Sequence, residues 1–78
     1  MVNLRLQKAI LEVVENQIRE NNPPETRKTL DRLLKNGYSK SDAMKLIGSV
    51  VVVEIYEILK NKEPFNEERY VKALRELR

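Results

Sequence analysis

The sequence predicts an all-α protein in which residues 1–78 form a single helical domain, a small four-helix bundle with a long central third helix. Apolar residues recur every three or four positions along most of the chain, which is the spacing of one helix face. The breaks in this pattern coincide with proline, glycine and residues that cap helices. No two segments alternate as a strand and its pairing partner would, so a sheet is not expected.

The first helix is expected to begin with Asn3 as its N-cap and to run to about Glu20. In the segment NNPPE that follows, Asn22 can cap a second helix, and the two prolines fit a first turn, whose N–H groups lack partners anyway. That helix should end at Gly37, because glycine accepts the left-handed conformation of a C-terminal cap. The expected inner stripe of the first helix consists of Leu6, Ile10, Leu11, Val13, Val14 and Ile18.

Ser39 and Asp42 have the spacing of a capping box and should open a third helix from about Lys40 to Asn61. The four β-branched residues of Val50–Val53 would pass for a buried strand if taken alone. A helical stripe nevertheless continues through them, so a helix is predicted. The stripe consists of Ala43, Leu46, Ile47, Val50, Glu54 and Ile58.

A fourth helix is expected after Pro64, which breaks the chain. Asn66 can cap it, and Phe65 can pack as a hydrophobic staple on Tyr70. The third helix contains Gly48, which costs about 1 kcal/mol relative to alanine in a helix interior. Close approach of another helix is the expected gain that offsets this cost, and a kink is the alternative.

Composition excludes several classes of function. The chain has no Cys and no His, which removes disulfides, thiolate chemistry, imidazole bases and most metal-ligand sets, so neither enzyme activity nor a cofactor is expected. Fifteen Lys and Arg are interspersed with twelve Asp and Glu, a balance typical of a solvated surface. The longest apolar run, Val50–Val53, is far shorter than the ~20 residues of a membrane span. The expected location is therefore the cytoplasm, with no membrane partner.

Several segments, in this order and spacing, resemble a family of small bacterial all-α domains of uncharacterised function: NLRL, VENQI, NPPE, TLDRLL, GYS, DAMKLIG, EIYEILK and PFNEERY. The resemblance spans nearly the whole chain and implies the same helical fold. Members of that family tend to have proline where this chain has Leu4. They tend to have histidine at the positions of Gln7, Leu11, Ser41 and Lys45. A site built on those histidines does not carry over to this chain.

Glu54 is the one acidic residue expected on an apolar stripe, where a charge is unusual. Together with Gln7 and Glu15 of the first helix it could form a polar cluster in the core. The functional interpretation is a weak or degenerate carboxylate metal site or an acid–base pair. The favoured interpretation is structural, with Glu54 paired to Arg5 or to an arginine of the fourth helix.

A DNA-binding helix-turn-helix is a further alternative, because LLKNGYSKSDAMKLIG has the rhythm of a helix, a glycine turn and a second helix. The recognition helix would have to follow Gly48. That segment is apolar and carries Glu54 and Glu57 with no basic residue before Lys60, so phosphate would repel it. Nucleic acid is accordingly not the expected partner, and no small-molecule ligand is identified.

The third helix is apolar almost all round over its middle turns, and such a helix must be covered on both sides. Three shorter helices in so small a domain would struggle to cover it. We therefore expect a structural or protein-interaction module that forms a homodimer or homo-oligomer, or binds another protein, through this helix. The expected interface consists of Val51, Val52, Ile55 and Leu59.

Overall fold

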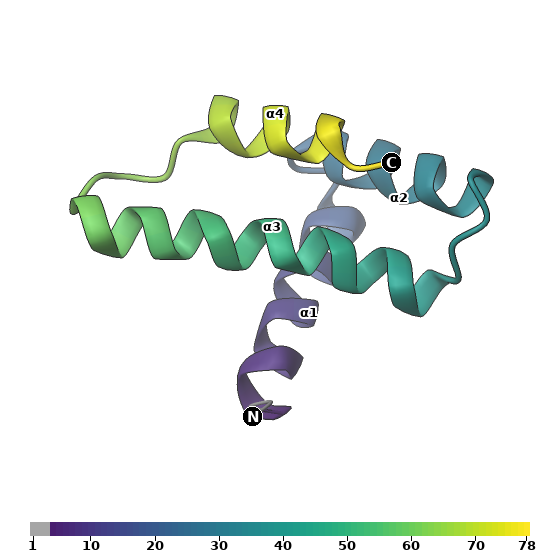
Figure 1. The fold of residues 1–78 in the computed structure, drawn as a ribbon, viewed down its shortest axis with the longest axis horizontal. Coiled ribbons are helices and arrows are strands. Elements are labelled where there is room, and N and C mark those ends of the chain that lie inside the picture. Colours follow the sequence, from purple (N-terminus) through teal and green to yellow (C-terminus); the bar gives the residue numbers. More distant parts are fainter. Residues whose placement is uncertain (1–3) are drawn as a thin grey trace.

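The computed structural model describes residues 4–78, which form four α-helices joined by short loops (Figure 1). The helices are α1 (Leu4–Glu20), α2 (Pro24–Lys35), α3 (Lys40–Asn61) and α4 (Glu67–Glu76). The all-α class is confirmed, as is the long third helix, whose observed bounds match the expected ones. Asn3, the expected N-cap of the first helix, lies outside the described residues.

The other helices are arranged around α3, which contacts each of them, and α2 also contacts α1 and α4. In Figure 1, α2 and α4 lie along one side of α3, whereas α1 crosses α3 near its middle. The N-terminal half of α1 therefore projects beyond α3. This crossing divides α3 into two halves and leaves a corner between the projecting arm and each half.

The crossing point lies at Gly48. A close approach of another helix was expected there, because it would offset the cost of a glycine within a helix. A Cβ atom added there would lie 3.1 Å from Cγ2 of Ile10 on α1, closer than ordinary van der Waals contact. Glycine therefore lets α1 approach α3 closely, and α3 continues as one helix through this residue. The expectation of close approach is confirmed.

Capping residues set most of the helix ends as predicted. Gly37 adopts a left-handed φ of 102° after α2, and the Ser39 hydroxyl accepts the N–H of Asp42 at 3.1 Å to start α3. The Asn66 side chain likewise accepts the N–H of Arg69 at 3.0 Å to start α4. Each cap satisfies a backbone donor or frees the chain to turn, which is why these boundaries could be predicted.

The start of α2 differs from the expectation. Its N-cap is Pro23 rather than Asn22, and no side chain caps it. The Pro23 carbonyl accepts the N–H of Thr26 at 3.2 Å, and Pro24 occupies the first helical position, where no N–H is needed. The helix thus begins one residue later than the side chain of Asn22 suggested.

The four helices bury one contiguous apolar core, in which α1 contributes less than its stripe predicted. Leu6 and Val13 are exposed, because the side of α1 on which they lie faces past α3 and not onto it. Leu11 and Ile18 pack at the edge of the core. The buried apolar residues are Ile10, Val14, Leu30, Leu33, Ala43, Met44, Ile47, Val51, Tyr70 and Leu74.

Candidate functional site

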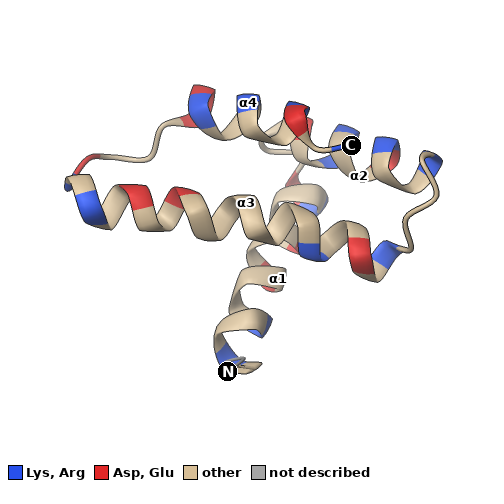
Figure 2. Cartoon of the chain, viewed as in Figure 1, with Lys and Arg blue, Asp and Glu red and all other residues tan. Residues whose placement is uncertain are grey.

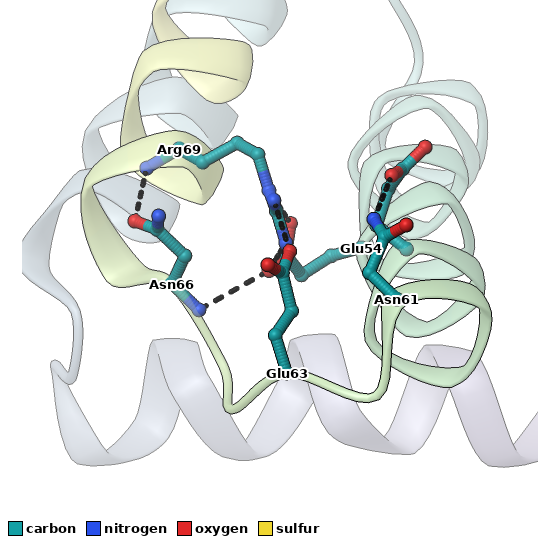
Figure 3. A network of polar contacts seen from close by, with 6 residues as sticks. Glu54, Asn61, Glu63, Asn66 and Arg69 are labelled. Atoms are coloured by element: carbon teal, nitrogen blue, oxygen red, sulfur yellow. Dashed lines mark hydrogen bonds and ion pairs between the residues drawn. The ribbon is translucent and has the colours of Figure 1, made fainter.

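Glu54 is 5% exposed and lies opposite the first residues of α4, where Arg69 meets it (Figure 3). Arg69 Nε donates to Glu54 Oε2 at 2.9 Å, and Arg69 Nη2 donates to Glu54 Oε1 at 2.8 Å. The backbone N–H of Asn66 also donates to Oε1, at 3.2 Å. This two-point guanidinium–carboxylate geometry is the strongest form of ion pair that these side chains make.

The same arginine holds a second carboxylate, because Arg69 Nη1 donates to Glu63 Oε1 at 2.6 Å. The hydrogen bond from Arg69 lowers the pKa of Glu54, against the opposing effect of burial, and the two carboxylates raise the pKa of Arg69. Glu54 is therefore ionised and fully paired at neutral pH. The structural interpretation, an ion pair with an arginine of the fourth helix, is confirmed, and the network fixes the start of α4 on α3.

The predicted cluster of Gln7, Glu15 and Glu54 is not formed. Glu15 is exposed, and Gln7 lies in a groove on the projecting arm of α1. Glu54 faces Arg69 on the side of α3 that α4 covers. The prediction was wrong because it assumed that α1 runs alongside α3, whereas α1 crosses it at one point.

The polar side chain of α1 that does reach the core is Gln17. Its Oε1 accepts the hydroxyl of Thr26 at 2.8 Å and the hydroxyl of Tyr70 at 2.7 Å. Burial raises the pKa of Tyr70, which keeps its hydroxyl protonated and able to donate. These bonds join α1, α2 and α4. The sequence carried a signal for them, because Gln17 lies seven residues after Ile10 and three after Val14, the two buried residues of α1.

Every buried side-chain nitrogen and oxygen in residues 4–78 has a hydrogen-bond partner. The polar groups of the core are thus satisfied within the chain, and none is left directed at a ligand. Within the same residues, no group of three or more acidic side chains is placed to hold a metal ion. A binding site formed by residues 4–78 would therefore lie on their surface.

A groove of about 340 Å³ lies where the arm of α1 leaves α3. Its lining includes Gln7, Leu11 and Lys45. One amide, one aliphatic chain and one ammonium group do not make a ligand set for a divalent cation. The full lining consists of Leu6, Gln7, Ile10, Leu11, Lys45, Gly48, Ser49 and Val52. This groove is a predominantly apolar recess.

Next to the groove, α3 exposes a line of large apolar side chains that we call the apolar strip. Val52, which lines the groove, is 44% exposed, and Ile55, Tyr56 and Leu59 are 41%, 60% and 73% exposed. Relative to Val52 these residues lie at i+3, i+4 and i+7, and so they share one face of the helix. Val51, which we expected in the interface, is only 5% exposed and belongs to the core. The buried face of α3 includes Met44 and Val51, whereas the predicted stripe had Leu46 and Val50 instead.

On α1, exposed Leu6 and Val13 lie seven residues apart on one side of the helix. Leu6 lines the same groove as Val52, so it adjoins the apolar strip. We call the strip together with Leu6 the apolar corner. Its exposed surface is on the order of 500 Å², taking about 180 Å² for a fully exposed large apolar residue. That is near the upper end for the largest patch of a monomeric protein, and here it occurs on a very small one.

Charged residues lie mostly around the apolar corner, and one of them, Lys60, places its Nζ over the Tyr56 ring, 5.9 Å from the ring centroid. Figure 2 shows both signs distributed over the helices, with basic residues near the two ends of α3. Glu54 and Glu57 line a shallow recess on the α4 side, together with Val53 and Ala73. The corner is accordingly suited to an apolar contact, and the polar group among its side chains is the hydroxyl of Tyr56.

No family model, no curated protein and no solved structure matches this chain. None of the helices described in residues 4–78 has the length and hydrophobicity needed to cross a lipid bilayer.

Proposed function

We propose that this protein is a small interaction module without enzyme activity, and that it self-associates through the apolar corner. One observation carries the proposal: Val52, Ile55, Tyr56 and Leu59 form a continuous exposed line on the longest helix. Covering such a surface removes apolar area from water, which is the main driving force of protein association.

The available area supports self-association. Two copies that cover their apolar corners bury on the order of 1,000 Å² in total, the lower bound for a specific interface. The corner itself consists of aliphatic residues and Tyr56, and charged side chains lie at its edge, among them Lys60 over the Tyr56 ring; an apolar centre with a charged rim is typical of protein–protein interfaces. A face used against a second copy must be self-complementary, and a mostly aliphatic face meets that requirement easily.

The two alternatives have less support. A helix-turn-helix needs a separate recognition helix after Gly48, whereas α3 is continuous from Lys40 to Asn61. A metal-binding bundle needs free inward-facing carboxylates, whereas Glu54 is paired with Arg69. As part of the same proposal we place the module in the cytoplasm of a bacterial cell and in the family that its sequence resembles. Imaging of the tagged chain in its host tests the compartment.

Charged substitutions in the strip test the proposal. We expect Val52→Glu and Leu59→Glu to abolish self-association while the helical content remains, because both side chains point away from the core. The matched control is Val53→Glu, since Val53 is 60% exposed on a different face of the same helix. Sedimentation velocity from micromolar to millimolar concentration measures the effect. A wild-type chain that remains monomeric over this range overturns the proposal, as does dissociation caused equally by Val53→Glu.

A further inference from the structure

The crossing of α1 over α3 limits how a second copy can cover the apolar strip. From Gly48, where α1 crosses, to Asn61 at its end, α3 offers a free length of about 20 Å, given a rise of 1.5 Å per residue. Along this length α4 lies on one side of α3 (Figure 1), and the residues of the strip are exposed on another side. A partner helix on the strip is therefore bounded at one end by α1.

We propose that two copies pair their strips antiparallel, about a two-fold axis that passes near Ile55, so that Leu59 of each copy packs beside the other copy's groove. This inference rests on the proposed function and adds the orientation and register of the contact. A two-fold dimer is the commonest symmetric oligomer, and it uses the same patch on both copies.

The orientation follows from the position of α1. In a parallel pair, equal residues lie at equal heights, so the partner's α3 has to pass the level of Gly48, where α1 and its exposed Leu6 stand in the way. In an antiparallel pair, the partner's α3 ends at Asn61 just as it reaches α1. The α1 helix of each copy then lies at the end of the other copy's α3. Only in this orientation can residues 48–61 of both copies be in contact along their whole length.

The register follows from the two ends of this free length, the crossing at Gly48 and the end of α3 at Asn61. The midpoint of residues 48–61 lies between residues 54 and 55, so Ile55 faces its own counterpart close to the axis. Leu59 of one copy then lies about level with residue 50 of the other, beside Val52 and the mouth of the groove. Leu59 is the most exposed apolar residue of the strip, at 73%, and the groove is the nearest recess that can receive it.

The charges at the rim distinguish this pairing from a complex with an acidic partner. Lys45 lies beside the groove and Lys60 follows Leu59, so antiparallel pairing brings lysines of the two copies toward each other. Added salt screens this repulsion and should leave the dimer unchanged or stronger. An acidic partner seated between the same lysines would be released by salt.

Single cysteines test the register, because the natural chain has none. We expect Ile55→Cys to form a disulfide-linked dimer with itself, and a mixture of Val52→Cys with Leu59→Cys to form the mixed dimer. Leu59→Cys alone should cross-link slowly, since its two copies lie about nine residues apart along the helix axis, beyond disulfide reach. Rates are compared with Lys72→Cys on the exposed face of α4, which reports random collision. The favoured pairs should form at least about tenfold faster, because a dimer raises the effective thiol concentration.

The outcomes separate the register from the proposed function. Fast self-linkage of Leu59→Cys shows a parallel pair, and equal rates at all positions show no defined register; either result overturns the antiparallel inference while the wild type still sediments as a dimer. A wild type that sediments as a monomer overturns both. A dimer that appears only with an added acidic protein and dissociates in salt assigns the corner to that class of partner and overturns the inference.

Discussion

At the scale of single residues, Glu54 is the side chain whose environment most constrains the fold. It is almost fully buried, and three donors from α4 and its N-cap satisfy it. Its partner Arg69 is 36% exposed, so solvent can still reach the guanidinium. Glu54 therefore depends on Arg69 more than Arg69 depends on Glu54.

This asymmetry predicts how two substitutions at Glu54 differ. Glu54→Gln keeps the shape and can still accept from Asn66, so we expect only a small loss of unfolding free energy. Glu54→Ala removes every acceptor and leaves space behind, and we expect a loss on the order of 2 kcal/mol, moderated by solvation of the exposed Arg69. Urea unfolding of both variants measures the difference, and equal losses would contradict the assigned role of the carboxylate.

The pH dependence follows from the direction of the Glu54 pKa. The pKa is lowered in the folded state, so the ion pair adds stability above the unfolded value, near 4.3. This contribution is lost as pH falls through the folded pKa. Melting temperatures between pH 7 and pH 2.5 should therefore fall more steeply for the wild type than for Glu54→Gln. Parallel curves would show that other carboxyl groups govern the acid transition.

At the scale of the elements, the contact between α1 and α3 depends on the absence of a side chain at Gly48. Gly48→Ala gains about 1 kcal/mol of helix propensity but places a methyl group 3.1 Å from Ile10 Cγ2. Overpacking of this kind costs about 1–3 kcal/mol, so we expect a net loss of about 1 kcal/mol. In an Ile10→Leu background, which lacks that Cγ2 methyl group, Gly48→Ala should be neutral or stabilising. A double-mutant cycle by denaturant unfolding measures this coupling.

Helix positions were predicted well because their signals are local. Ser39, Asn66 and Gly37 act within one turn of themselves, and their roles could be inferred from neighbouring residues alone. The face that each helix buries depends instead on how the helices cross. Leu6 and Val13 fit the inner stripe of an isolated α1, yet they lie outside the core because α1 passes over α3 at a single point.

At the scale of the whole molecule, the difference between local signals and contacts made only by the packed helices explains what could be predicted of the candidate site. The excess of apolar residues on α3 was evident from its composition. Of the four residues expected in an interface, Val52, Ile55 and Leu59 are exposed and Val51 is buried; the interface itself stays a prediction. The pairing of Glu54 with an arginine of α4 was predicted, but the contact of Gln17 with Tyr70 was not, because these residues lie 53 positions apart in the sequence and meet only in the fold. The groove could not be predicted either, because it forms only where α1 crosses α3 and projects beyond it.

The core joins helices that are distant along the chain, which predicts cooperative unfolding. Leu30 on α2 and Leu74 on α4 are both buried, and we expect Leu30→Ala and Leu74→Ala each to cost about 2 to 4 kcal/mol. Leu34→Ala, at a half-exposed position of α2, is the control and should cost less. Each variant should shift one unfolding transition monitored by circular dichroism. Separate transitions for α2 and α4 would indicate that they do not share one core.

The ion pair between Glu54 and Arg69 also has a consequence for the order of events at the ribosome. Translation proceeds from the N-terminus, so Glu54 on α3 leaves the ribosome before Arg69, which follows it by fifteen positions in the sequence. Until then a carboxylate sits on the apolar face of α3 with no counter-charge, and docking that face would require burying it alone. The nascent chain should therefore remain loosely helical until α4 emerges and then fold in one late step.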